Sequence, residues 1–342
     1  MSSAVAPAPQ LAAEAIPKRR FDFVPIGLLA LLMLAAWPAT GSTSTWITLT
    51  LAGLAMGMII FIAASGLTLV FGLMDVLNFG HSLFIALGAY VATSVLGFLS
   101  GWTAAPALAL NLAAIFLALL AAMTLAGVLG LGFERVIVRP VYGQHLKQIL
   151  VTLGGAIVGE ELIKAVWGPA QIALPPPEAL RGSILLGEAT VDKMRLVSVA
   201  VGLVVLAVLL WTLNRTKIGL LIRAGVQDRE MVESLGYRIR RLFVGVFAAG
   251  SALAGLGGTL WGMNQQTVVP QIGGQVNVLI FIVIIMGGLG STLGCLIGAL
   301  LVGLLTNYVG FLTPKLTMFS SIGLMVAVLL WRPQGLYPVT SR

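Results

Sequence analysis

Charged residues are scarce in this sequence, and their scarcity excludes an ordinary soluble domain. Asp, Glu, Lys and Arg make up 9% of the 342 residues, against about 25% in soluble domains, whereas hydrophobic residues make up 58%. Three long stretches carry no charge at all, residues 23–74, 76–133 and 242–314. A helix of about 20 apolar residues crosses a bilayer. Each of these stretches is long enough to hold two or more such spans.

The apolar stretches also lack the alternation of polar and apolar residues expected of barrel strands. In lipid every backbone N–H and C=O needs an internal partner, which leaves helices and closed barrels as the spanning structures. The sequence therefore predicts an all-α, polytopic membrane protein with one membrane domain over residues 21–337. Residues 1–20 are expected to form a disordered cytoplasmic tail. The basic run at 18–20 before a short apolar segment resembles a signal peptide, but the many later spans favour an uncleaved first helix.

Cysteine and histidine are almost absent. Cys295 is the single cysteine and stands in an apolar run, which excludes a disulfide framework or a cysteine metal cluster. The two histidines, His81 and His145, are far apart, and no nucleophile or metal-ligand pattern accompanies them. The Gly-rich loop ending in Lys-Ser/Thr that holds ATP phosphates is missing as well. We therefore expect no catalytic residue, no metal and no cofactor on this chain, and no ATP hydrolysis by it.

Glycine and proline interrupt the apolar stretches and divide them into helices. Breaks are expected at 37–38, 101–106 and 313–314. Two further interruptions, near 72–82 and 286–294, fit either a tight cytoplasmic turn or a broken, re-entrant segment, so we predict eight to ten spans. The expected helices lie near residues 24–38, 46–72, 82–100, 105–130, 149–167, 196–213, 242–263, 276–290, 293–312 and 316–331.

Lys and Arg indicate the orientation, because they are enriched in cytoplasmic loops. With the N-terminus inside, ten alternating spans place five of the twenty cations outside, the other fifteen inside, and both termini in the cytoplasm. The net charge of +8 then has its origin in the inner loops, and no nucleic-acid partner is needed to explain it. The five outer cations are Lys164, Arg181, Lys193, Arg195 and Lys315.

Two long polar segments remain, an outer loop at 168–195, expected to be ordered, and an inner loop at 214–241. Within the inner loop we predict a short helix over 226–235, with apolar residues at helical spacing and acidic residues toward its N-terminus. The positive-inside rule explains the charge of this loop but not a helix with an apolar face, which favours docking into a groove on a partner. The expected docking residues are Arg223, Asp228, Glu230, Glu233, Leu235 and Gly236.

Several motifs in a fixed order carry a resemblance to a known family. Residues 218–237 read Ile-Gly-Leu-Leu-Ile-Arg-Ala-Gly-Val-Gln-Asp-Arg-Glu-Met-Val-Glu-Ser-Leu-Gly-Tyr and precede an Ala/Gly-rich helix at 247–262. Residues 66–90 contain Gly-Leu, Asn-Phe-Gly-His and Gly-Ala-Tyr in that order. Glu-Arg at 134–135, Met-Gly-Gly-Leu-Gly-Ser at 286–291 and Arg-Pro-Gln-Gly-Leu at 332–336 complete the set. Together they resemble the permeases of branched-chain amino acid ABC importers, from about residue 50 to 337. One departure is Val-Glu-Ser at 232–234, where an alanine is more usual in that family.

The resemblance implies a permease that carries branched-chain or other small amino acids across a bacterial-type inner membrane. It implies a second permease subunit, homologous or identical, and two cytoplasmic ATPase subunits that hold ATP and Mg²⁺ and dock at the inner loop. It also implies an extracytoplasmic binding protein that delivers the substrate, in addition to the surrounding membrane lipid. Urea and short-amide importer permeases share these motifs and are an alternative, as is a secondary transporter or channel without an ATPase.

Polar residues at membrane depth are candidates for the substrate path, because burying them is costly. Asp75, Asn78 and His81 are three residues apart and share one helix face. They either line the path or hold a turn together by hydrogen bonding, and in a secondary transporter Asp75 and His81 would relay protons. The Gly-rich interruption near 287–291 is the second candidate, because broken helices free backbone groups for a substrate. The path candidates are therefore Asp75, Asn78, His81, Gly287, Gly288 and Ser291.

Overall fold

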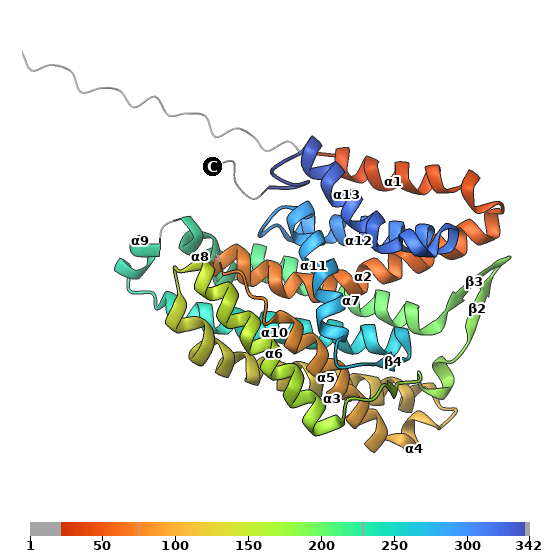
Figure 1. Cartoon of the computed structure of the whole chain (residues 1–342), viewed down its shortest axis with the longest axis horizontal. Coiled ribbons are helices and arrows are strands. Elements are labelled where there is room, and N and C mark those ends of the chain that lie inside the picture. The colour runs from red at the N-terminus through yellow and green to blue at the C-terminus, as the bar shows by residue number, and fades with distance from the viewer. Residues whose placement is uncertain (1–21, 75, 228, 339–342) are drawn as a thin grey trace, which may run out of the picture.

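The computed structural model describes residues 22–338 apart from 75 and 228, so the tail expected at 1–20 lies outside the described residues. Over that range the chain forms long helices with short connections (Figure 1). The described helices of 13 residues or more are α1 (Val24–Ala36), α2 (Thr43–Met74), α3 (His81–Phe98), α5 (Leu108–Phe133), α6 (His145–Trp167), α7 (Lys193–Arg215), α10 (Ile239–Gln265), α11 (Ile272–Gly287), α12 (Thr292–Leu312) and α13 (Thr317–Trp331). Shorter ones are α4 (Ser100–Thr103), α8 (Lys217–Gln227) and α9 (Arg229–Ser234).

The helices confirm the prediction of an all-α, polytopic membrane protein. Seven helical segments of the described chain are long and apolar enough to cross a bilayer, those that contain α2, α3, α5, α7, α10, α12 and α13. The apolar helices α1 and α11 are shorter, and α6 carries four charged residues among its 23. Each of the ten helices expected from the apolar runs corresponds to one long helix. Which of the three shorter or more polar helices cross the membrane completely stays a prediction.

Helices α2, α3 and α10 form the centre of the bundle. In their most apolar windows 78%, 61% and 67% of the residues are buried, against 22% for α7 and 11% for α13. Small residues allow this close packing, since a Cβ atom on Gly258 of α10 would lie 2.0 Å from the carbonyl oxygen of Ile85 in α3. A Cβ on Gly66 of α2 would likewise lie 2.3 Å from the carbonyl oxygen of Gly250.

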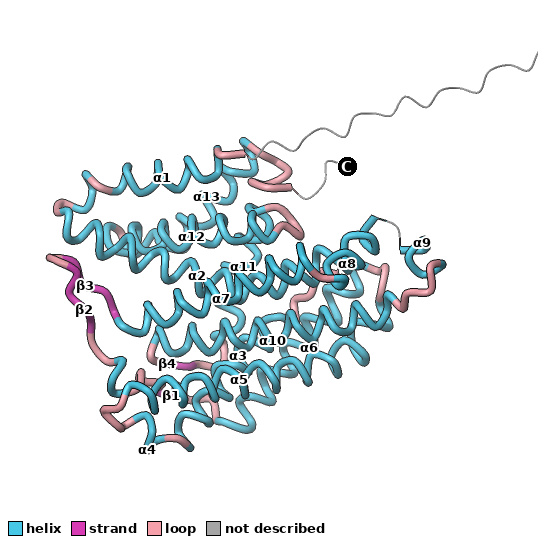
Figure 2. The backbone as a smooth tube through the Cα atoms, turned by 180° about the vertical axis from the view of Figure 1, so that it is seen from behind, coloured by secondary structure: helices cyan, strands magenta, loops and turns pink. Residues whose placement is uncertain are grey.

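Four short strands of the described chain lie at one end of the bundle (Figure 2). In the outer loop β2 (Ser183–Leu186) and β3 (Ala189–Asp192) form an antiparallel hairpin, and β1 (Ile172–Ala173) pairs with β4 (Thr267–Val268). Asn111, at the start of α5, accepts a hydrogen bond from the backbone N–H of Ala179 in the same loop at 2.8 Å. The outer loop at 168–195 is thus ordered and tied to two helices, as its composition predicts.

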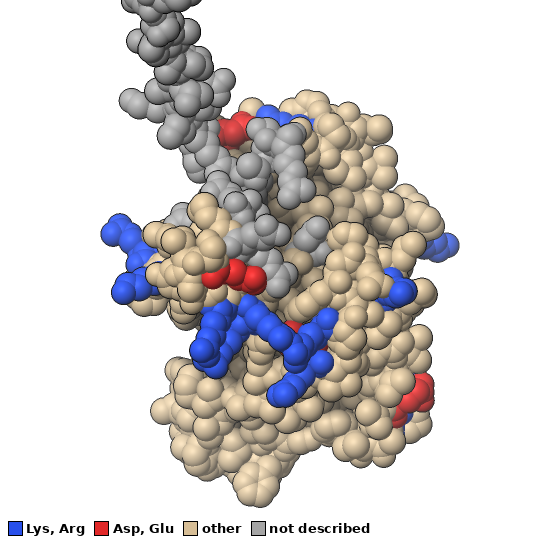
Figure 3. Space-filling view, turned by 90° about the vertical axis from the view of Figure 1, so that its left-hand side faces the viewer, with Lys and Arg blue, Asp and Glu red and all other residues tan. Residues whose placement is uncertain are grey.

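The opposite end carries α8, α9 and the described ends of the chain (Figure 1), and we call it the inner end. Lys and Arg side chains gather on the face that carries it (Figure 3). Exposed cations that the positive-inside rule assigns to the cytoplasm include Arg135, Arg139, Lys147, Arg215, Lys217, Arg238, Arg240 and Arg241. A helical bundle with its cations at one end is the arrangement expected of a chain oriented by the positive-inside rule.

Candidate functional site

The two interruptions are about 200 residues apart in the sequence and meet at the inner end. The first lies between α2 and α3, and the second, residues 288–291, lies between α11 and α12. A Cβ atom on Gly72, near the end of α2, would lie 2.7 Å from the Cα of Gly290. Each interruption connects a helix that approaches the inner end with one that leaves it. The close approach of Gly72 and Gly290 joins the two at one junction. The contact lies at one end of a longer interface between α2 and α12, in which a Cβ on Gly57 would lie 2.8 Å from the Cα of Leu300.

In the first interruption His81 and Asn78 are both buried, each 1% exposed. The His81 Nε2 donates to the carbonyl oxygen of Ala63 at 2.9 Å and joins the first residue of α3 to the middle of α2. The Asn78 Oδ1 has no hydrogen-bond partner among the described residues. Asp75 lies outside the described residues. His81 thus has a turn-stabilising contact, whereas Asn78 offers an acceptor, and a substrate contact for either stays a prediction.

In the second interruption the small residues shape a tight turn. Gly288 has φ +101°, a conformation that favours glycine. A Cβ on Gly294 would lie 2.0 Å from the carbonyl oxygen of Gly287 across the turn. The Ser291 side chain caps α12 by accepting from the Gly294 N–H at 3.1 Å. These contacts explain why the turn requires glycine at Gly287 and Gly288 and a capping side chain at Ser291. A role for these residues in the substrate path stays a prediction.

Residues after α13 cross this turn, and the sequence pattern did not indicate it. The backbone N–H groups of Leu336 and Tyr337 donate to the carbonyl oxygens of Met286 and Gly287 at 2.9 and 3.0 Å. Residues 332–338, which we call the C-terminal strap, therefore pair with the end of α11. The only sequence signal was the Arg-Pro-Gln-Gly-Leu motif, whose position gives no hint of its partner.

Three buried polar side chains that sequence reasoning did not select lie on helices near the first interruption. Asn277 of α11 is 7% exposed and Gln148 of α6 is 1% exposed, and the side-chain oxygen of each has no hydrogen-bond partner among the described residues. Glu134, also 1% exposed, accepts from the Tyr142 hydroxyl at 2.5 Å. It begins a π-helical turn, Glu134–Val138, that follows α5. Of the three, Asn277 stands inside a charge-free apolar run, where a search for isolated polar residues would have found it.

Asn277 lies on the α11 face that packs against the start of α3. The rings of Phe281 and Phe79, one on α11 and one just before α3, are 4.7 Å apart at their centroids. Four residues before Asn277, a Cβ on Gly273 would lie 2.0 Å from the carbonyl oxygen of Ser82. Since residues four apart share a helix face, Asn277 belongs with the first interruption and is a further candidate for the substrate path.

The inner loop contains two helices instead of the single one predicted over 226–235. Residues 217–227 already form α8, and α9 begins only at Arg229, so the predicted start was wrong. The predicted stop at Gly236 is confirmed, since Gly236 has φ +85°. The Gly236 N–H donates to the carbonyl oxygen of Glu233 at 3.0 Å, and the Tyr237 N–H donates to the carbonyl oxygen of Val232 at 3.3 Å. Together these two bonds form the Schellman motif. The side chains of Arg223 and Glu230 and the whole of Asp228 lie outside the described residues.

The apolar residues of α9 divide between the bundle and the solvent. Val232 is 2% exposed and packs with Ile239 and Phe243 at the start of α10. Met231 and Leu235 are 54% and 66% exposed. Burial of Val232 positions α9 on the bundle, while Leu235 is directed outward at the inner end. Exposed apolar side chains on a short helix are suited to a groove on another protein.

Acidic and basic side chains of α6 form a small network away from the inner end. The Lys164 Nζ lies 2.9 Å from Glu160 Oε1 and 2.8 Å from Glu161 Oε1. Lys164 therefore pairs with both carboxylates, one of them four residues earlier on the same helix and the other three. Within the described chain no group of three or more His, Cys, Asp or Glu side chains is placed to hold a metal ion.

Comparison with known proteins identifies the family. A family model described as the branched-chain amino acid transport system permease component matches residues 49–329. The chain belongs to this family. BraD of Pseudomonas aeruginosa is 26% identical over 83% of this chain and 93% of its own length, and LivH of Escherichia coli is 27% identical over 83% and 92%. LivM of Escherichia coli is 32% identical over 92% of this chain and 75% of its own length.

All three of these relatives are named as high-affinity branched-chain amino acid transport system permease proteins. The resemblance noted from the motifs is therefore confirmed: this is a multi-pass membrane permease of the branched-chain amino acid type. The matched range includes both interruptions and the helices α8 and α9. No solved structure matches the chain significantly.

Proposed function

We propose that this chain is a membrane-spanning subunit of an ATP-driven importer of branched-chain amino acids in a bacterial inner membrane. A second permease of the LivH or LivM kind would complete the passage, and two cytoplasmic ATPase subunits would supply the energy from ATP and Mg²⁺. A binding protein outside would deliver the substrate. Asn78, Asn277 and the backbone of the first interruption are the groups that we place along the path.

The inner-end helices α8 and α9 are the observation that supports an ATP-driven mechanism most. The pair is followed by a glycine stop and held to the bundle through Val232, and it presents Leu235 outward. Basic side chains lie close to it in sequence, among them Arg238, Arg240 and Arg241, all exposed. An ATPase subunit that closes on ATP would move α9, and the contact of Gly72 with Gly290 would carry that movement into the spans.

The test is uptake of labelled leucine by proteoliposomes that contain both permeases, the ATPase subunits and the binding protein. We expect uptake that requires ATP. Leu235→Asp is expected to lower uptake and co-purification of the ATPase by about tenfold or more, because a charge would replace a central apolar contact. Leu185→Asp is the matched control, since Leu185 is 72% exposed in the hairpin at the other end, and both values are expected to stay at the wild-type level.

Three results would contradict the proposal in different ways. Uptake that survives ATP depletion and collapses with a protonophore would favour a secondary transporter. Normal ATP-driven uptake by Leu235→Asp would remove the docking role of α9. Uptake of urea or acetamide in place of leucine, with the binding protein encoded for this system, would assign the chain to short-amide import.

A further inference from the structure

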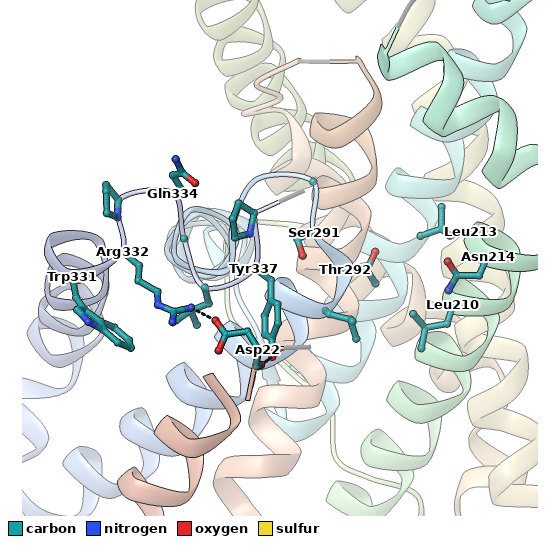
Figure 4. Close-up of a pocket in the computed structure, with 16 residues that line it drawn as sticks. Asp22, Leu210, Leu213, Asn214, Ser291, Thr292, Trp331, Arg332, Gln334 and Tyr337 are labelled. Atoms are coloured by element: carbon teal, nitrogen blue, oxygen red, sulfur yellow. Dashed lines mark hydrogen bonds and ion pairs between the residues drawn. The ribbon is translucent and has the colours of Figure 1, made fainter. Parts of the chain in front are cut away.

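A cavity of about 770 Å³ opens at the inner end, between α7, the turn from α11 to α12 and the C-terminal strap. Its volume is within the about 300–1,000 Å³ typical of small-molecule sites. One side is formed by Asp22, which precedes α1, and by Arg332 of the strap, which point toward each other (Figure 4). Leu210, Leu213 and Asn214 of α7 lie on the other side. Ser291, a candidate of the predicted substrate path, also lines the cavity, whereas Asp22, Arg332 and the residues of α7 do not belong to that path.

Among the described residues that line the cavity, one carboxylate and one guanidinium pair with each other. Asp22 Oδ2 and Arg332 Nη1 form an ion pair, with side chains 36% and 27% exposed. The other carboxylate oxygen accepts from the Val24 N–H at 3.0 Å. The hydrogen bond from Arg332 is the main reason that the pKa of the Asp22 carboxyl lies below its ordinary value, and the hydrogen bond from Val24 is the second. The Asp22 carboxyl is therefore charged at neutral pH, and a partly exposed ion pair of this kind contributes little to stability, so it opens easily.

A free aliphatic amino acid carries the charges that complement this pair. Its ammonium group needs an anionic acceptor, and its carboxylate matches the two parallel N–H groups of a guanidinium. When the pair opens around such a ligand, each side chain exchanges one charged partner for another and none is left unpaired. The leucines of α7 together with Leu293 of α12 offer an apolar surface for a branched side chain.

We propose that this cavity binds a free branched-chain amino acid from the cytoplasm, with Asp22 holding the ammonium and Arg332 the carboxylate, and that the bound ligand slows import. The slowing follows from position. Arg332 begins the strap whose Leu336 and Tyr337 pair with the end of α11, and α7 forms the opposite wall. A ligand held between them restrains the second interruption, which has to move for transport. That the ligand is a branched-chain amino acid rests on the proposed function.

Direct binding is the first test, with labelled leucine and the purified permease complex in the absence of the binding protein. We expect saturable binding that Asp22→Asn and Arg332→Gln each weaken by about tenfold or more. Two analogues test the charges: 4-methylpentanoate lacks the ammonium and 3-methylbutylamine lacks the carboxylate, and both are expected to compete about tenfold less well. Arg181→Gln is the control, because Arg181 forms another ion pair with a carboxylate, Glu178, at the outer end, where the two side chains are more exposed, at 52% and 48%.

Any one of three results would overturn the proposal. These are wild-type affinity for leucine in Arg332→Gln, competition by 4-methylpentanoate equal to that by leucine, and no leucine binding to the wild-type complex. Thermal unfolding of each variant identifies those that fail to fold. For these the double variant Asp22→Arg with Arg332→Asp restores the pair in reverse, and leucine binding by it at wild-type affinity supports the assignment.

Uptake gives the second test and separates the two proposals. With leucine enclosed on the cytoplasmic side, wild-type proteoliposomes should import labelled leucine more slowly, and Arg332→Gln should not respond to the enclosed leucine. Equal slowing in both would overturn the regulatory role. If leucine binds with the expected charge dependence but neither the wild-type nor the variant proteoliposomes import it, the proposed function fails while the cavity assignment stands.

Discussion

The closest contacts of the bundle are made by single glycine residues, and two glycines of α10 form a matched pair for testing them. A Cβ on Gly258 would lie 2.0 Å from a backbone oxygen of α3, whereas nothing lies within 4 Å of one on Gly245. We expect Gly258→Ala to destabilise the protein by about 1–3 kcal/mol through overpacking. Gly245→Ala should be neutral or stabilise by up to about 1 kcal/mol, since alanine favours helix.

The measurement is unfolding of the purified permease in detergent, by temperature or denaturant. Equal stability of the two variants would show that α3 and α10 can separate at no cost, and the tight central packing would then be wrong. Gly287→Ala is expected to behave like Gly258→Ala, because its Cβ would lie 2.5 Å from the backbone of Gly294.

The charge state of Asp22 predicts that the proposed leucine binding in the cavity is independent of pH over the physiological range. The pKa of the Asp22 carboxyl is lowered below the ordinary aspartate pKa of about 4. The ion pair with Arg332 is therefore complete above pH values of about 4, and it is lost only as the pH falls through the lower pKa of the folded protein. We expect the affinity for leucine to be constant from about pH 5.5 to about pH 8. A midpoint near about pH 6.5, where histidine titrates, would assign the ligand to another site.

At the scale of elements, the end of α9 depends on one backbone conformation. Gly236 has φ +85° with open space around it, so an added side chain meets strain but no neighbour. Gly236→Ala is expected to cost about 1–2 kcal/mol locally, to loosen the end of α9 and to lower the ATPase stimulation by leucine-loaded binding protein. Gly225→Ala in α8 is the control, with an ordinary φ and its nearest neighbour, Ile239, at 3.4 Å, and stimulation is expected to stay normal.

The inner loop also shows what a helix prediction from sequence can reach. The stop at Gly236 was predicted because glycine is favoured at the left-handed position that follows a helix. The start was wrong because residues 217–225 contain two glycines and no acidic residue, which gives no signal for a helix. Tertiary packing forms α8 all the same, since Ile222 is buried with Leu73 of α2 and Val246 of α10.

At the scale of the whole molecule, the orientation can be tested with single cysteines. The chain has one cysteine, and Cys295 is fully buried, so the labelling background is low. Leu185→Cys in the outer hairpin is expected to react with a membrane-impermeant maleimide in intact cells. Leu235→Cys is expected to react only after the membrane is opened. The reverse pattern would invert the topology and place α9 outside, where no ATPase could reach it.

The candidate path was predictable only in part, because a pattern locates polar residues along the chain but not their partners. Asp75, Asn78 and His81 were selected for their spacing, and the contact of His81 with Ala63 shows a turn-stabilising role for one of them. Asn277 was missed because it stands alone in an apolar run. Gly287 and Ser291 were selected as breaks, but that Gly287 pairs with the strap and the neighbouring Gly290 meets α2 depends on contacts made by distant segments.

The sequence by itself determined the membrane location, the helical class, the approximate helix positions and the expected orientation. These follow from local properties: apolar side chains leave water, backbone groups in lipid must bond within a segment, and cations stay in the cytoplasm. Only the tertiary structure decided that Gly72 meets Gly290 and that Asp22 pairs with Arg332 across 310 residues to line one cavity. Such contacts depend on how all the helices pack together, and no local pattern contains that information.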